Sequence, residues 1–424
     1  MPADRPALTL RRVAVTGMGV VSPVGSSCDQ FFDNLLAGKS GIRRLSASFA
    51  GGLSARIGGE VEFDPAVHFP KAKLGLLDRF SQFALVAAAQ AVLDSGMALD
   101  DKLQERAGVF LGIGMGGAQT LEAGYSELFL QRKERLPPFT VLRTMNNAAA
   151  AHISMDFGLR GPSYTYSTAC SSSSIAIGEA VRAIRHGYAD AALAGGAESL
   201  FSLGTLRAWE ALRTLALEDA QDPAASCRPF SRDRTGLVLG EGAGVIVLED
   251  LESARRRGAR IYAEVIGYGA ASDAAHIAKP DMAGQVRAMR AALEDAGIAP
   301  AEVDYLNAHG TATVAGDVIE TAAIKQVFGA QAGRIPVSST KSMHGHLMGA
   351  AGAVEFVAAI LAIVRGAIPP TANLRVADPE CDLDYVANEG RSGIAVRTVM
   401  SNSFAFGGSN AVLIARSLEA CHRA

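Results

Sequence analysis

Cysteine is scarce in this chain, and its five copies are scattered at Cys28, Cys170, Cys227, Cys381 and Cys421. No two of them form a CxxC pair, so the sequence predicts no disulfide framework, and this usage fits a reducing cytoplasm. A strong net charge is also missing, since 40 Lys and Arg residues face 43 Asp and Glu residues. This balance argues against general nucleic-acid binding.

Long apolar runs are almost absent as well. The N-terminal residues lack the apolar core of a signal peptide, so we expect none there. The most apolar long stretch, residues 347–364, contains Glu355 and many alanines and glycines. We therefore interpret it as a buried helix and expect no membrane span.

What the chain has in abundance is glycine, with 45 copies, and apolar residues, which make up 49 % of its 424 residues. Strand-like and helix-like patterns alternate throughout, which predicts an α/β protein. The pattern restarts near residues 250–262, so we expect two α/β halves, residues 1–258 and 259–424. The main strands are expected at 12–17, 107–111, 161–166, 190–194, 244–248, 263–267, 304–308, 336–338, 396–401 and 411–414, and the main helices at 29–37, 77–96, 175–184, 284–296 and from 349.

One glycine cluster imitates a nucleotide-binding motif. Residues 112–117 contain a formal GxGxxG after a predicted strand. A dinucleotide site also needs an acidic residue at the end of a second strand about 20 residues later. That region reads QRKERLPP, which is not a strand, so no nicotinamide cofactor is predicted.

Cys170 lies in the sequence TACSS, between a β-rich run and a segment with helical spacing. This pattern predicts a sharp strand-to-helix turn with the cysteine near the helix start. Free backbone N–H groups and the helix dipole favour a thiolate at such a place. The alternative is a buried cysteine that acts as a small apolar residue.

Two histidine segments accompany this cysteine. His309 lies in NAHGT at the end of a predicted strand, and His346 ends KSMHGH just before an apolar helix. Together with Cys170 they form a candidate nucleophile and acid/base set. His344 and His346 could share a metal, but no thiolate or carboxylate lies at ligand spacing, so no metal site is expected. The segment 402–410, with paired glycines beside two phenylalanines, suggests a loop that approaches a ligand.

These motifs, together with the segment 227–244, resemble the β-ketoacyl-acyl carrier protein synthases, specifically the elongating type II group. The resemblance covers about residues 12–414 and has the three motifs in family order. It implies a thiolase-like fold, with two similar halves in a five-layer αβαβα sandwich. It implies an acyltransferase that condenses malonyl-acyl carrier protein with a cysteine-bound acyl chain to give a 3-oxoacyl product, in fatty acid or related polyketide or polyene elongation.

The resemblance also implies roles for individual residues. Catalysis falls to Cys170, His309, His346 and Lys341, and the network is supported by Glu355. The oxyanion hole is formed by the backbone N–H groups of Cys170 and Phe406. The remaining roles are pantetheine binding by Thr311 and Thr313, and an acyl pocket and gate formed by Met115, Thr140, Phe404, Ala405 and Phe406.

The implied partners are an acyl carrier protein and a second subunit, in a homodimer or in a heterodimer with a related synthase-like chain. No metal or redox cofactor is implied. Carrier docking is expected at the basic residues Lys71, Lys73 and Arg79, with Arg213 as an addition.

Several positions depart from the family pattern. Ala405 replaces a glycine between the two gate phenylalanines, which predicts a restricted swing of the gate. His344 stands where threonine is common, and we interpret it as a neighbour of the site. These changes keep open an accessory synthase of a specialised polyketide or polyene pathway. A silent chain-length partner is disfavoured by Cys170, and a starter-type enzyme that uses coenzyme A is disfavoured by the second histidine.

Overall fold

Ten strands form one mixed sheet in the computed structural model, which describes residues 10–418. The N-terminal five strands are β1 (Val13–Val21), β4 (Ala107–Gly112), β5 (Ser163–Tyr166), β6 (Ala191–Glu198) and β7 (Gly242–Asp250). The C-terminal five are β8 (Ala263–Ser272), β9 (Tyr305–Asn307), β10 (Val337–Ser338), β13 (Thr398–Phe404) and β14 (Ser409–Arg416).

The two sets of strands repeat one topology. From the middle of the sheet outward, the N-terminal order is β1-β7-β6-β4-β5 and the C-terminal order is β8-β14-β13-β9-β10. When the five strands of each half are numbered along the chain, both halves therefore have the order first, fifth, fourth, second and third. Within the sheet, the described strands of the two halves meet at β1 and β8 through two antiparallel pairs, Ala14 with Glu264 and Val15 with Ala263. The predicted two similar halves are thus confirmed, while the division at residue 258 stays a prediction.

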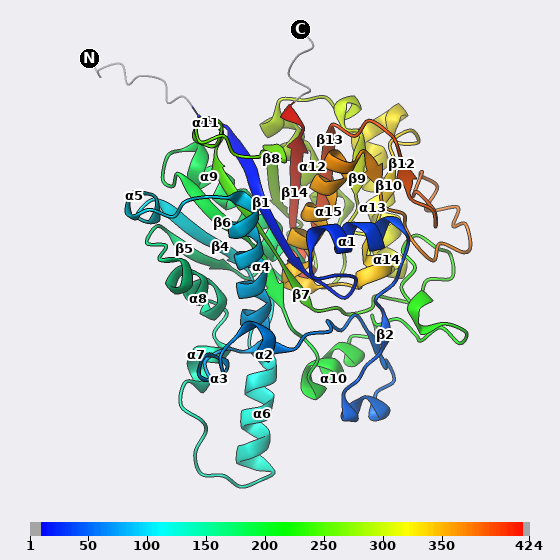
Figure 1. Ribbon diagram of the computed structural model, residues 1–424. Helices are drawn as coiled ribbons and strands as arrows, with labels where there is room; N and C mark the ends of the chain where they lie inside the picture. The colour runs from blue at the N-terminus through cyan, green and yellow to red at the C-terminus, as the bar shows by residue number, and fades with distance from the viewer. Residues whose placement is uncertain (1–9, 419–424) are drawn as a thin grey trace.

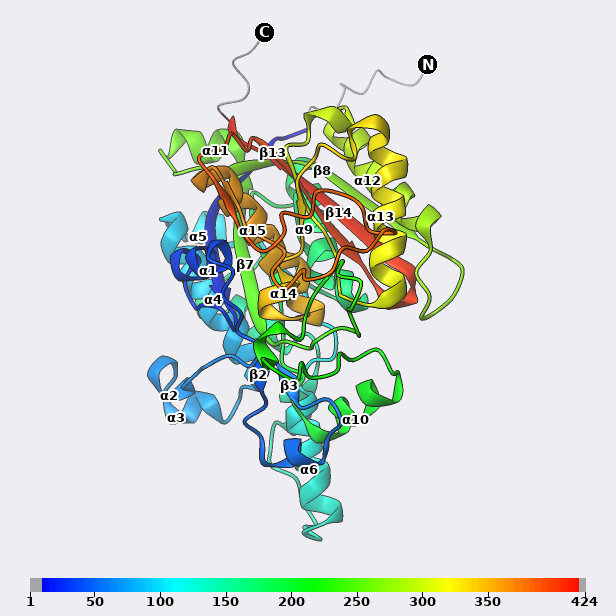
Figure 2. The same ribbon diagram turned by 90° about the vertical axis from the view of Figure 1, so that its right-hand side faces the viewer.

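Helices lie between the two sets of strands and on the outer face of each set, which gives five layers. α9 (Ser172–Arg185) and α15 (Ala351–Arg365) share one apolar core with strands of both halves and lie between them (Figures 1 and 2). α4 (Arg79–Ser95) and α8 (Ala148–Phe157) pack on the other face of the N-terminal strands. The C-terminal strands are covered in the same way by α12 (Met282–Ala296) and α13 (Val314–Phe328). This is the αβαβα arrangement that the resemblance implied.

α15 is the central helix expected from the apolar stretch. The window Met348–Arg365 is long and apolar enough to cross a membrane, but 83 % of it is buried inside the fold. Its neighbours are strands of both halves and α9. The apolar character of α15 therefore comes from its place in the core.

The remaining elements are short or peripheral. Figure 1 shows α6 (Ala118–Phe129) extending away from the layered body, with α7 (Thr140–Thr144) beside its base. The sequence predicts no helix between β4 and β5, where the structure has α6, α7 and α8. The other helices are α1 (Cys28–Leu36), α2 (Pro65–His68), α3 (Lys71–Leu74), α5 (Asp101–Gln104), α6 (Ala118–Phe129), α7 (Thr140–Thr144), α10 (Leu203–Ala211), α11 (Leu251–Arg256) and α14 (Lys341–His344), and the short strands are β2 (Arg43–Arg44), β3 (Ile57–Gly58), β11 (Ala367–Ile368) and β12 (Arg391–Ser392).

Most predicted strands are present but longer than expected, as β7 illustrates, because alanine and glycine at strand ends carry a weak β signal. Cys421 lies outside the described residues.

Candidate active site

Cys170 lies at the strand-to-helix turn that the sequence predicts. β5 ends at Tyr166, a short 3₁₀ turn spans Ala169–Ser171, and α9 begins at Ser172. Ala169 has a φ of +52°, a left-handed value that is uncommon for a residue with a side chain. This strained turn places Cys170 at the N-terminal end of α9, where only 4 % of the residue is exposed.

The thiol of Cys170 is protonated in the free protein. Burial raises the pKa of Cys170 to about 11, although the Phe406 backbone N–H and the charge of Lys341 act to lower it. The expected helix-start thiolate is therefore wrong for the free protein, because desolvation outweighs the favourable groups. The backbone N–H of Phe406 donates a hydrogen bond to the sulfur of Cys170.

This protonation state predicts how Cys170 reacts with iodoacetamide. Only the thiolate is alkylated, so the rate should rise roughly tenfold per pH unit from pH 7 to pH 10 with no plateau. Mass spectrometry of the Cys170 peptide measures this rate. In the urea-unfolded chain the same rate should be half-maximal at about pH 8.5, the ordinary thiol pKa, and level off above it. A plateau near neutral pH in the folded protein would contradict the assignment.

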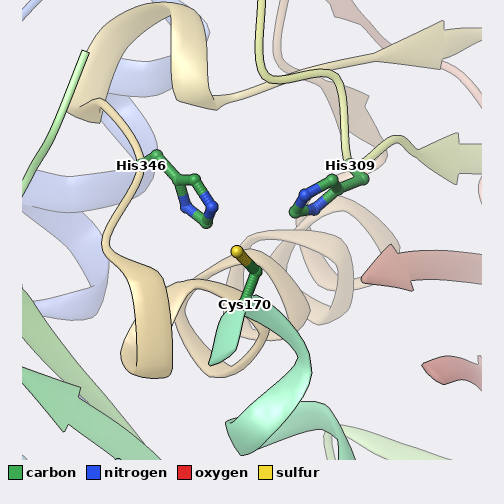
Figure 3. Close-up of side chains that lie close together, drawn as sticks. All are labelled: Cys170, His309 and His346. Atoms are coloured by element: carbon green, nitrogen blue, oxygen red, sulfur yellow. The ribbon is translucent and has the colours of Figure 1, made fainter. Parts of the chain in front are cut away.

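Two histidine rings face the sulfur of Cys170 (Figure 3). His309 follows β9, and His346 follows α14. Their ring centroids are 5.3 Å apart at an interplanar angle of 84°. The sulfur and one nitrogen of each ring all lie within 4.8 Å of one another. The structure thus brings together three residues that are far apart in the sequence.

Both rings are neutral. Burial, followed by the charge of Lys341, lowers the pKa of His309 and of His346 well below the ordinary value. The backbone N–H of Met348 donates to His346 Nδ1 at 3.3 Å. Because Nδ1 accepts, we assign the ring proton to Nε2. Within residues 10–418, buried Nε2 of His346 has no hydrogen-bond partner, so its N–H is free to bind a ligand.

Lys341 and Glu355 form an ion pair in the core beside this set. Both side chains are at most 1 % exposed. Burial raises the pKa of Glu355 to about 7, and the charge of Lys341 opposes this rise. The ion pair places a fixed positive charge near both histidines, where it disfavours their protonation.

Two buried carboxylates, which the sequence analysis does not single out, hold loops of the candidate site in place. Glu320 accepts the backbone N–H groups of His309 at 2.8 Å and Gly310 at 2.7 Å. Glu198 accepts from Gly114 at 2.8 Å and Gly349 at 3.1 Å, which ties together two glycine turns. The only sequence signal for them is an acidic residue within an otherwise apolar strand or helix, and such a residue is seldom buried without a partner.

A cavity of about 280 Å³ opens onto the three reactive side chains. Thr311 and Thr313 line it, with their hydroxyl oxygens 3.1 Å apart. The exposed residues Arg213 and Lys279 also lie on its wall. Met115 and Thr140, predicted for the acyl pocket, do not line this cavity: Met115 is 44 % exposed, and Thr140 lies at the start of α7.

The predicted gate, Phe404 to Phe406, forms part of the cavity wall. Phe404 packs on His309 with ring centroids 6.1 Å apart, and Phe406 packs on Trp209 at 6.0 Å. Ala405 has a φ of −112°, which an alanine adopts without strain. The positive φ values fall on Gly407 and Gly408. In this conformation the alanine is therefore compatible with the gate.

Two of the four basic residues expected for carrier docking form ion pairs within the chain. Arg79 pairs with the buried Glu241 at 2.6 Å, and Lys73 pairs with Asp156. Lys71 and Arg213 are exposed. Arg79 is therefore better explained as a structural cation than as a docking residue.

A buried thiol beside two neutral imidazoles at one cavity fits the class that the resemblance implied, the condensing acyltransferases, which form carbon–carbon bonds on a cysteine-bound acyl group. Comparison with known families agrees. Residues 10–254 match the family "Beta-ketoacyl synthase, N-terminal domain", and residues 262–375 match "Beta-ketoacyl synthase, C-terminal domain". The chain belongs to the beta-ketoacyl synthase family, and its reaction is the condensation that gives a 3-oxoacyl product.

Individual relatives span nearly the whole chain. The 3-oxoacyl-[acyl-carrier-protein] synthase 2 of Staphylococcus aureus is 42 % identical over 413 residues, 97 % of this chain and 99 % of its own length. Nodulation protein E of Rhizobium sp. is 44 % identical over 408 residues, 96 % of this chain and 100 % of its own. The solved ishigamide ketosynthase/chain length factor has a TM-score of 0.89 at 38 % identity, and the match covers 96 % of this chain and 99 % of that one.

Proposed function

We propose that Cys170 carries the growing acyl chain while His309 and His346 promote loss of carbon dioxide from a malonyl thioester. The observation that supports this most strongly is the convergence of the sulfur and two imidazole nitrogens within 4.8 Å at one cavity. Two neutral N–H donors suit an oxyanion that forms during the reaction.

In the first step the Cys170 sulfur attacks the carbonyl carbon of an acyl thioester. The carbon–sulfur bond to the pantetheine arm breaks, and the proton of Cys170 ends on the departing pantetheine thiol. The tetrahedral oxyanion accepts hydrogen bonds from the backbone N–H groups of Cys170 and Phe406. The contact of the Phe406 N–H with the sulfur supports this oxyanion hole.

In the second step a malonyl thioester loses carbon dioxide, and the electron pair moves to an enolate. The enolate oxygen accepts N–H donation from His309 and His346. Its carbon then attacks the acyl carbonyl on Cys170, and the Cys170 thiolate leaves. Burial, reinforced by the charge of Lys341, which Glu355 holds in place, keeps both rings neutral, so that they act as donors without first losing a charge.

An acyl carrier protein is the proposed source of both thioesters. The S. aureus relative is named for such a carrier. Thr311 and Thr313 offer hydroxyl groups to the amides of a pantetheine arm, and Arg213 and Lys279 offer charge to its phosphate. The reaction requires no metal or redox cofactor, and a cytoplasmic location fits the chemistry.

A second subunit is proposed to cover the face formed by β5 and the α6–α7 segment. β5 is an edge strand of the sheet, and an edge strand leaves backbone groups unpaired. Large apolar side chains are exposed on β5 and on the segment from α6 to just after α7: Tyr125, Phe129, Leu130, Phe139, Val141, Leu142, Met145 and Tyr164. Met115 and Thr140 belong to this region, so the partner would complete an acyl pocket there. The partner is a second copy of this chain or, as in the ishigamide ketosynthase/chain length factor, a related subunit.

Glutamate at both Val141 and Leu142 should convert the assembled protein into monomers, because a stable interface does not accommodate two unpaired buried charges. Sedimentation velocity measures the mass. Leu93→Glu is the matched control, since Leu93 is 84 % exposed on α4, away from this face. Unchanged assembly of the double variant would place the interface elsewhere.

The experiment that tests the proposed function is mass spectrometry of carrier-bound products. Purified protein is supplied with malonyl-carrier and a panel of acyl primers that differ in length and unsaturation. A 3-oxoacyl product two carbons longer than its primer supports the function, and the preferred primer separates ordinary fatty acid elongation from a specialised chain. Absence of any condensed product across the panel would contradict it.

A further inference from the structure

His344 is a buried histidine that the proposed mechanism does not use. It lies two residues before His346, at the end of α14, and is 0 % exposed. Its ring lies 6.5 Å from that of Phe31. Neutral imidazole is costly to bury unless both nitrogens find partners, so its contacts are informative.

Both ring nitrogens of His344 are occupied. Nδ1 lies 2.7 Å from the carbonyl oxygen of Gly345, and Nε2 lies 2.9 Å from the hydroxyl oxygen of Thr340. A carbonyl oxygen only accepts, so Nδ1 donates to Gly345 and Nε2 accepts from the Thr340 hydroxyl. Burial lowers the pKa of His344 to about 3, so the ring remains neutral beside Lys341.

The two hydrogen bonds of the His344 ring hold the turn that leads into His346. Gly345 has a φ of +75° and a ψ of −173°, and its N–H donates to the Lys341 carbonyl at 2.9 Å. On the other side, the His346 N–H donates to the Val238 carbonyl at 2.7 Å, and its carbonyl accepts from the Gly240 N–H at 2.9 Å. The peptide between Gly345 and His346 is therefore fixed by His344 from one end and by the 238–240 segment from the other.

The surroundings leave this turn little room to move. A Cβ added at Gly59 or at Gly240 would lie 2.4 Å or 2.5 Å from the His344 carbonyl oxygen. The backbone at His344 is thus enclosed by two glycine segments, and its ring is held by Thr340. A rotation of the Gly345 peptide would be transmitted to the His346 ring.

We propose that His344 is a positioning residue that sets the orientation of His346 by donating a hydrogen bond to the Gly345 carbonyl. The inference rests on the proposed role of His346 in carbon dioxide loss. His344 itself touches no substrate. Its effect is on the step that uses His346 and not on the transfer of the acyl group to Cys170.

The test compares two substitutions of similar size. In His344→Asn the amide nitrogen takes the place of Nδ1 and retains a donor for Gly345, whereas in His344→Gln the amide reaches toward Thr340 and the Gly345 donor is lost. Carbon dioxide release from malonyl-carrier is measured in a Cys170→Gln background. Acyl transfer to Cys170 is measured by mass spectrometry in single turnover.

We expect His344→Gln to slow carbon dioxide release at least tenfold with acyl transfer unchanged within twofold, and His344→Asn to recover most of the lost rate. Equal loss in both steps, or equal loss in the Asn and Gln variants, would mean a purely structural role and overturn the proposal. If His344→Gln does not fold, Thr340→Val is compared with Thr340→Ser instead. Valine removes the hydroxyl that holds Nε2 of His344, whereas serine retains it.

One control separates this inference from the proposed function. If His346→Ala releases carbon dioxide at the full rate, the proposed role of His346 is wrong. If His346→Ala loses the activity and His344→Gln keeps it, the role of His346 stands and the positioning by His344 is wrong.

Discussion

Cys170→Ala should abolish condensation, with a loss of at least about 10⁴-fold in the rate of 3-oxoacyl product formation, the scale seen when a catalytic nucleophile is removed. In the proposed mechanism the sulfur is the group to which the acyl chain is bound, and within residues 10–418 no other cysteine lines the cavity. The small alanine side chain fits the space, so the fold should persist.

The measurement is carrier-bound product by mass spectrometry, with thermal unfolding as a check on the fold. Cys227→Ala is the matched control, because Cys227 is a buried cysteine away from the cavity lining, and it should retain condensation. Condensation at an undiminished rate in Cys170→Ala would remove the basis of the mechanism.

His309→Ala and His346→Ala should each slow carbon dioxide release by about 10²- to 10³-fold, the cost of removing one donor to a developing oxyanion. Removal of either ring leaves the enolate oxygen with one imidazole donor. His186→Ala, an exposed histidine at the end of α9, should have no effect. Full activity in either active-site variant would contradict the assigned roles.

The same assignment predicts that neither histidine ring gives an inflection in the pH response of this step. The pKa of both histidines lies well below 6.5, so both rings stay neutral, and their N–H donors are unchanged, as pH falls from 8 to 6. An inflection near pH 6.5 that disappears in His309→Ala or His346→Ala would show instead that a ring is protonated in that range.

The sequence could single out Cys170, His309 and His346 because each lies in a short motif, and the structure brings the three side chains together. Cys170 follows a β-rich run and precedes helical spacing, and His309 and His346 each lie beside a predicted element boundary. The two halves could be predicted for the same reason, since the alternation of strands and helices restarts after β7. Such local patterns determine secondary structure and the ends of elements.

The parts that could not be predicted depend on contacts between distant segments. The raised pKa of Cys170 comes from burial, and residues from several other segments, among them Leu45, Leu239 and Met348, belong to its apolar cluster and cannot be recognised from the sequence at a helix start. Glu198 and Glu320 act through backbone groups of other elements. Met115 and Thr140 lie outside the cavity of the single chain, and a pocket shared between subunits has no signature within one sequence.

Carbon dioxide release by Cys170→Gln most directly tests the central claim, which is that the cysteine holds the chain while the histidines act on malonate. The glutamine removes the nucleophile and leaves His309 and His346 in place, so release from malonyl-carrier should continue without any condensed product. Addition of His346→Ala to this variant should slow the release by about 10²- to 10³-fold. Failure of Cys170→Gln to release carbon dioxide, with its fold intact, would contradict this division of roles.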